Sequence, residues 1–234
     1  LGLSVGGGPS LLTGNGSETV TASSTGNPGT STSYSRDVDV NRTQIDGVAE
    51  LYAGYQLSSS SSVGLAADYF FTDLNQTSAY SLGQETTDYD APIFSHDYEL
   101  KLTDRMAYLL RYTYTLPGQP RLSIGVEGGI SSQKVKVTQS LTTYDDDTNQ
   151  ADSFASHSDD KNQIGAAVGT FSKFAVTDRL FLSGRYLFNY VGKVDYDDSE
   201  PRTVGPRDDD VTVSFNSSQK IWVNSLLFQI GYMI

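Results

Sequence analysis

Hydrophobic and polar residues alternate with a period of two along much of the chain, most clearly between Met106 and Glu127. The even positions of 106–116 carry Met, Tyr and Leu, whereas the odd positions carry Ala, Leu, Arg and Thr. The alternation resumes at Leu122, after the sequence Pro-Gly-Gln-Pro at 117–120. Period two is typical of β-strands, and two such runs that flank a short Pro/Gly turn predict a β-hairpin.

Eight segments of the chain alternate in this way, and helical periodicity is almost absent. They are residues 1–7, 43–57, 62–72, 106–116, 122–127, 162–176, 180–194 and 226–234. Short connections at 58–61, 117–120 and 177–179 take turns with long polar ones at roughly 13–42, 81–97, 141–161 and 195–211. This order predicts one all-β domain over 1–234, an up-and-down antiparallel β-barrel of eight strands. We expect several strands to continue past the apolar segments as a polar β-extension.

The two faces of the predicted strands decide what surrounds the barrel. One face carries Tyr, Leu, Phe and Ile, and the other carries mainly Gly, Ala, Ser and Thr with single charges. In a water-soluble barrel the bulky face would have to fill a lumen that eight strands leave narrow. In the inverted arrangement the bulky face meets lipid and the small residues line the lumen. The inverted arrangement suits both faces, so the sequence predicts a transmembrane barrel.

Five charged residues share the predicted lumen-facing side, each on a different strand and about five to eight residues from a short turn. Because opposite charges at one level of a closed lumen can pair, the cost of removing them from water is offset. The sequence therefore predicts a lumen charge network, and hence a closed lumen, formed by Glu50, Asp68, Arg111, Glu127 and Arg185.

Composition excludes several classes of function. The net charge of −12 argues against a nucleic acid partner. There is no Cys, so disulfides, thiolate nucleophiles and Cys-ligated metals are excluded. No apolar run approaches the ~18 residues of a transmembrane helix.

The last strand, Leu-Leu-Phe-Gln-Ile-Gly-Tyr-Met-Ile at 226–234, alternates to its final position. It resembles the terminal strand of bacterial outer-membrane proteins, with Ile234 in place of the usual Phe. Together with the eight strands and the unequal connections, the chain resembles the small OmpA/OmpX-type outer-membrane barrels. The resemblance implies a bacterial outer-membrane location, contact with lipid and lipopolysaccharide, and a structural, adhesive or host-interaction role, although some members modify lipids.

The chain offers few candidates for catalysis or metal binding. His96 and His157 are its two histidines, and both fall in predicted long connections, where a solvent-exposed loop position is the simplest interpretation. Acidic clusters in the connections at 141–161 and 195–211 could bind Ca²⁺ or Mg²⁺ weakly, although a solvated acidic rim is the simpler interpretation. The candidate ligands are Asp145, Asp146, Asp147, Asp208, Asp209 and Asp210.

We therefore expect a non-enzymatic barrel without a cofactor, which acts as a structural or surface-interaction protein with acidic extracellular connections. An extracellular or envelope protein is the expected partner. Two alternatives stay open at this point. One is a subunit of a larger secretion or electron-transfer assembly, and the other is a lipid-modifying enzyme or protease that uses His96 or His157.

Overall fold

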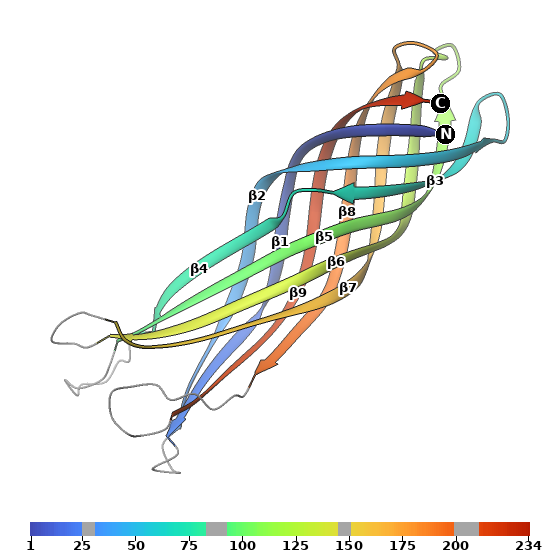
Figure 1. The fold of residues 1–234 in the computed structure, drawn as a ribbon. Coiled ribbons are helices and arrows are strands. Elements are labelled where there is room, and N and C mark those ends of the chain that lie inside the picture. The colour runs from blue at the N-terminus through green and yellow to red at the C-terminus, as the bar shows by residue number, and fades with distance from the viewer. Residues whose placement is uncertain (25–30, 83–92, 145–150, 199–210) are drawn as a thin grey trace.

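The computed structural model describes residues 1–24, 31–82, 93–144, 151–198 and 211–234, and all of its regular structure is β-strand (Figure 1). The strands are β1 (Gly2–Ser24), β2 (Ser31–Gln56), β3 (Ser61–Phe70), β4 (Leu74–Leu82), β5 (Ile93–Thr115), β6 (Leu122–Tyr144), β7 (Ala151–Ala175), β8 (Leu180–Asp198) and β9 (Val211–Met233). None of the described residues forms a helix that is long and apolar enough to cross a membrane.

The strands form one closed antiparallel sheet. Strands that are neighbours in sequence pair with each other, except β3 and β4, and β1 pairs with β9. The pairing of β3 with β5 closes the ring. Strands β3 and β4 both pair with β5 and are separated only by residues 71–73, so they form one stave of the barrel in two pieces. The predicted eight-stranded up-and-down barrel is thus confirmed, with its third stave interrupted.

One end of the barrel holds the short turns and both termini (Figure 1). The backbone amide of Leu57 donates to the carbonyl of Ser61 at 2.9 Å, and the amide of Leu116 donates to the carbonyl of Leu122 at 2.9 Å. The amide of Ile234 donates to the carbonyl of Leu1 at 2.8 Å, which ties the two termini together. We call this the short-turn end.

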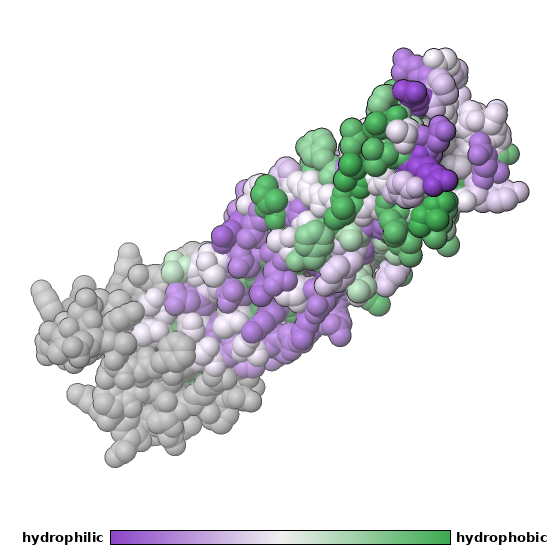
Figure 2. All heavy atoms as spheres, turned by 45° about the horizontal axis from the view of Figure 1, so that its top comes forward, coloured by the Kyte–Doolittle hydropathy of each residue, from purple (hydrophilic) through white to green (hydrophobic). Residues whose placement is uncertain are grey.

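A belt of apolar side chains surrounds the barrel next to the short-turn end, and it appears in green in Figure 2. Every exposed large hydrophobic residue of the described ranges lies in it, from Ile45 on β2 to Leu57 just after that strand, and over the matching part of each other stave. At ~3.3 Å per residue and ~45° tilt, the β2 segment rises about 28 Å. This height matches the ~25 Å apolar band of a transmembrane barrel. Aromatic residues mark its two edges, with Tyr55, Tyr114 and Tyr232 near the turns and Trp222 and Tyr190 at the far edge.

Beyond the belt, the barrel continues as the predicted polar β-extension. The strands there run further than the sequence indicated, since β1 reaches Ser24 and β2 begins at Ser31 inside a connection predicted over 13–42. The outer wall of the extension is polar, whereas its interior holds an apolar core. That core consists of Leu12, Val38, Val40, Leu74, Tyr98, Leu100, Leu102, Val135, Val137, Val191, Val194, Tyr196, Ile221 and Val223. Within the belt the barrel therefore has an apolar outer wall and a charged interior. In the extension it has a polar outer wall and an apolar interior.

Two bulges shift the alternation where belt and extension meet. On β5 the register with β6 shifts between Thr103 and Met106, and Asp104 takes a φ of 49°. On β8 the register with β9 shifts between Tyr190 and Gly192, and Gly192 takes a φ of 112°, a conformation that suits glycine. Because each bulge adds a residue to one strand, the inward-facing positions change parity across it.

Candidate functional site in the barrel lumen

The structure brings all five predicted lumen charges together inside the belt. Glu50 on β2 lies directly opposite Asp68 on β3, and Arg111 on β5 lies directly opposite Glu127 on β6. Arg185 reaches the same level from β8. All five side chains are buried.

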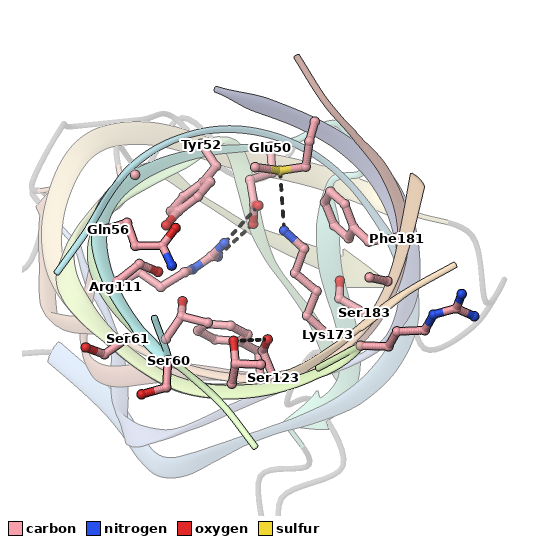
Figure 3. A pocket seen from close by; sticks show the side chains of 18 of the residues that line it. Glu50, Tyr52, Gln56, Ser60, Ser61, Arg111, Ser123, Lys173, Phe181 and Ser183 are labelled. Carbon is pink, nitrogen blue, oxygen red and sulfur yellow. Dashed lines mark hydrogen bonds and ion pairs between the residues drawn. The ribbon is translucent and has the colours of Figure 1, made fainter. Parts of the chain in front are cut away.

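Two guanidinium groups join the three carboxylates. Arg111 makes a bidentate pair with Glu50, with Nη1–Oε1 at 2.9 Å and Nη2–Oε2 at 2.7 Å (Figure 3). It also donates to Oε2 of Glu127 from Nε at 3.0 Å and from Nη2 at 2.8 Å. Arg185 donates to Asp68 at 2.6 Å and to Glu50 at 3.3 Å, and its Nε bonds Oε1 of Glu127.

This arrangement resolves a conflict within the sheet. Two carboxylates directly opposite each other on neighbouring strands repel, as Glu50 and Asp68 would. Arg185 comes from the far side of the barrel and pairs with both. The network therefore connects staves that share no backbone hydrogen bonds.

Gly169 on β7 gives Glu127 the space that the network needs. A Cβ atom at this position would lie 2.7 Å from Oε1 of Glu127 and 2.6 Å from the carbonyl oxygen of Tyr186. We expect Gly169→Ala to lower the free energy of unfolding by about 1–3 kcal/mol, because a packed interior has no room for the methyl group. Denaturant unfolding of the barrel in lipid vesicles measures this change.

Gly128 on β6 supplies the matched control. A Cβ atom there would meet nothing closer than 3.7 Å, so Gly128→Ala should leave the stability unchanged or slightly increased. Equal destabilisation by the two alanines would contradict a specific role for the space at Gly169.

A second buried ion pair, between Asp46 and Arg105, was not predicted. Nη1 of Arg105 lies 2.6 Å from Oδ2 of Asp46, and Oγ of Ser10 lies 3.0 Å from the same oxygen. The guanidinium also stacks on Phe70, with 4.6 Å to the ring centroid. Parity could have revealed this pair, since Asp46 shares the lumen face with Glu50, and Arg105 shares it with Arg111.

His96 lies inside the extension, and its predicted solvent-exposed loop position is wrong. It belongs to β5, and its ring is wholly buried. Its Nδ1 is 2.9 Å from Oε1 of Glu18, which also pairs with Arg36, and its ring stacks on Phe215. The residues before and after His96 belong to the polar outer wall of the extension, so the sequence around His96 is as polar as that of a loop. Ser95 and Asp97 point away from His96, as expected for neighbours on a strand.

His157 also belongs to a strand rather than a connection, since it lies on β7 opposite Gln139 of β6. It is half-buried and, like His96, lies at a lumen-facing position of the extension, since Gln139 opposite it is buried.

The six aspartates proposed as metal ligands, at 145–147 and 208–210, lie outside the described residues. Within the described ranges, no group of three or more His, Cys, Asp or Glu side chains could hold a metal ion. Nearby Asp160 is paired instead with Lys134 on the outer wall of the extension. The hydrogen bond from the Lys134 ammonium holds the pKa of Asp160 below its ordinary value.

A cavity of about 290 Å³ opens from the charge network towards the short-turn end (Figure 3). We call it the short-turn vestibule. Arg111, Glu50 and Arg185 form its inner end, and Lys173 extends into it from β7. Lys173 faces the lumen by parity but was not among the predicted site residues.

These features agree with each other on the environment of the barrel. The strands close antiparallel, the outside carries an apolar belt with aromatic edges, and the lumen within that belt is charged. The chain is a transmembrane β-barrel. Because the sheet is closed within the belt, no edge strand exposes unpaired backbone N–H and C=O groups there, and lipid could not form hydrogen bonds with such groups.

Comparisons with known proteins add the following. No protein-family model matches the chain, and no curated protein matches it. Among solved structures it is similar to the outer membrane protease OmpT from Escherichia coli, at 11% identity and a TM-score of 0.48, covering 100% of this chain and 97% of that one.

Two further structures are the outer membrane protein OprG from Pseudomonas aeruginosa and Neisserial surface protein A. OprG is 10% identical with a TM-score of 0.45, over 100% of this chain and 96% of its own. The Neisserial protein is 14% identical with a TM-score of 0.33, over 96% of this chain and 97% of its own.

Proposed function

We propose that this barrel is a non-enzymatic surface-interaction protein that does not conduct, and that its polar extension and long connections present a binding surface outside the cell. The observation that carries the proposal is the closure of the lumen at two separate levels. A barrel that is filled along its axis offers its outer wall and connections to partners, rather than a pore.

The first closure is the lumen charge network, whose side chains cross the barrel from five staves. The second is the apolar core of the extension, in which Leu74, Leu100 and Leu102 are wholly buried. An ion would have to break buried charge pairs and then cross a hydrocarbon interior, and both steps are costly.

The extension gives the barrel its external surface. At ~3.3 Å per residue and ~45° tilt, the part of β2 from Ser31 to Gln44 projects about 30 Å beyond the belt. The short-turn end then faces the periplasm, as in barrels with short periplasmic turns. Lipid and lipopolysaccharide are the expected partners of the belt and its outer edge, and a protein or glycan outside the cell is the expected partner of the extension.

A non-catalytic role for the histidines is part of the proposal. The ring of His96 is wholly buried and paired with Glu18, so a lipid or peptide substrate could not reach it without opening the extension. No cofactor is required. Weak Ca²⁺ or Mg²⁺ binding by the acidic connections stays an expectation.

Planar-bilayer recording tests the closure. We expect the purified full-length chain to give no stable conductance steps, because both closures persist in the folded barrel. A porin reconstituted in the same bilayer provides the positive control. Large, stable channels would contradict the closed lumen.

Labelling of intact cells tests the orientation. A membrane-impermeant amine reagent should modify Lys193, whose side chain is 56% exposed on the extension, and should spare Lys173 inside the vestibule. Modification of Lys193 only after permeabilisation of the outer membrane would place the extension in the periplasm and overturn the proposal.

A further inference from the structure

The short-turn vestibule contains a cation that the charge network leaves without a partner. The ammonium of Lys173 lies 3.4 Å from Sδ of Met233 and 3.7 Å from the ring centroid of Phe181 (Figure 3). The ion pairs of the charge network join Arg111 and Arg185 to the carboxylates, and no ion pair among the described residues includes Lys173. The thioether and the aromatic ring make up for only part of the hydration that the half-buried ammonium loses. An anion beside the ammonium would therefore lower the free-energy cost of its burial.

Charge around the vestibule favours an anion. Of its cationic lining residues, Arg111 and Arg185 are paired with the three carboxylates of the network, so the network itself carries one negative charge in excess. Lys173 and Arg121 are the further cations of the lining, and they bring the sum of these charges to +1. Glu50 is already held by both guanidinium groups, so it leaves the ammonium of Lys173 available to a ligand.

Aromatic rings and hydroxyl groups form the walls. Tyr52 and Phe181 line the cavity together with Ser123 and Ser183 (Figure 3), and Phe171 is also among its lining residues. Phe181 packs on Gly231 of the neighbouring strand, where an added Cβ would lie 2.1 Å from the ring. The ring is therefore held in place before any ligand enters, and apolar walls with a few fixed polar groups are typical of small-molecule sites.

We propose that the short-turn vestibule is a binding site for a small organic anion, which places a carboxylate or phosphate beside Lys173 and an aromatic or apolar group among Tyr52, Phe171 and Phe181. A cavity of about 290 Å³ accommodates a single-ring molecule. The charge network closes its inner end, so the ligand enters and leaves from the short-turn side. This site does not depend on the proposed surface function.

Binding of phenyl phosphate and of benzoate to the full-length barrel, in zwitterionic detergent, tests the proposal by titration calorimetry and ligand-observed NMR. At least one of the two should bind saturably, and the preferred one identifies the anionic group. Lys173→Gln should weaken its binding tenfold or more, because a charge-assisted hydrogen bond is lost. Lys173→Arg should keep the affinity within about threefold, since the charge remains.

Lys220→Gln is the matched control, because Lys220 lies on the outer wall of the extension, and it should bind as the unmodified chain does. Phe181→Leu separates the two halves of the site, since it should weaken phenyl phosphate or benzoate but not inorganic phosphate. Binding that is unchanged in Lys173→Gln, equally tight binding of uncharged benzyl alcohol, or no saturable binding would each overturn the proposal. If the glutamine variant does not fold, the comparison of benzoate with uncharged benzyl alcohol and the Phe181→Leu variant decide the same question.

Discussion

Replacing Arg185 with methionine should lower the free energy of unfolding by about 3–5 kcal/mol, the cost of removing one partner from a buried ion pair. Arg185 is 2% exposed and pairs with Asp68, Glu50 and Glu127. Methionine fills similar space but leaves three buried carboxylates to share the single guanidinium of Arg111. The uncompensated charge, rather than a cavity, is the reason for the loss.

Denaturant unfolding in phospholipid vesicles measures this change, with Trp222, the only tryptophan of the chain, as the fluorescent probe. Arg179→Met is the control, because Arg179 lies exposed in a short turn and donates to the hydroxyl of Tyr232 at 3.0 Å. We expect it to cost less than about 1 kcal/mol. If the two methionine variants are equally stable, the network does not hold the staves together.

Arginine in place of Phe228 should lower the free energy of unfolding by about 2–4 kcal/mol, the cost of a basic side chain near the bilayer midplane. Phe228 is 60% exposed in the middle of the belt on β9. Its ring meets the hydrocarbon of the membrane.

Asn216→Arg is the matched control on the same strand. Asn216 has the same parity as Phe228 but lies exposed in the extension, so arginine there should change the stability by no more than about 0.5 kcal/mol. Trp222 fluorescence during denaturant unfolding reports on both variants. Equal effects at the two positions would mean that the apolar belt does not define the membrane-spanning part.

Both pairs of variants test one property of the barrel. Along its axis, the apolar residues change from the outer side of the wall to the inner side. Within the belt, charged residues fill the lumen and lipid covers the apolar wall. In the extension, water covers a polar wall and the apolar residues fill the lumen. In each part the outer wall suits the medium around it, which is lipid at the belt and water at the extension. The bulges at Asp104 and Gly192 lie at the boundary between the belt and the extension.

The candidate site could be predicted from the sequence only as a set of residues. Parity alone places Glu50, Arg111 and Arg185 on the lumen side, because successive residues of a strand alternate between its faces. Parity does not give partners. Arg185 and Asp68 are 117 residues apart and meet because the ring closes between them.

The residues that sequence reasoning missed were missed for physical reasons. Arg105 follows the bulge at Asp104, where the alternation breaks, so it stood outside the predicted strand. His96 sits among polar residues whose wall faces water, and such a strand resembles a loop when its interior neighbours are unknown. Lys173 lies at the end of a predicted strand, and only the folded barrel shows which side chains surround it.

The sequence by itself determined the staves, their antiparallel order and the side of each that carries charge in the belt, because period two and turn length are local properties of the chain. Only the tertiary structure decided which side chains of the extension face the interior of the barrel and which face water. Alternation such as Lys-Val-Lys-Val at 134–137 has the same period whether its valines point to lipid or to a core. The valines point inwards because closure brings Val135 and Val137 into one core with Leu12 of β1 and Ile221 of β9, two strands that do not pair with β6, and no single segment encodes that meeting.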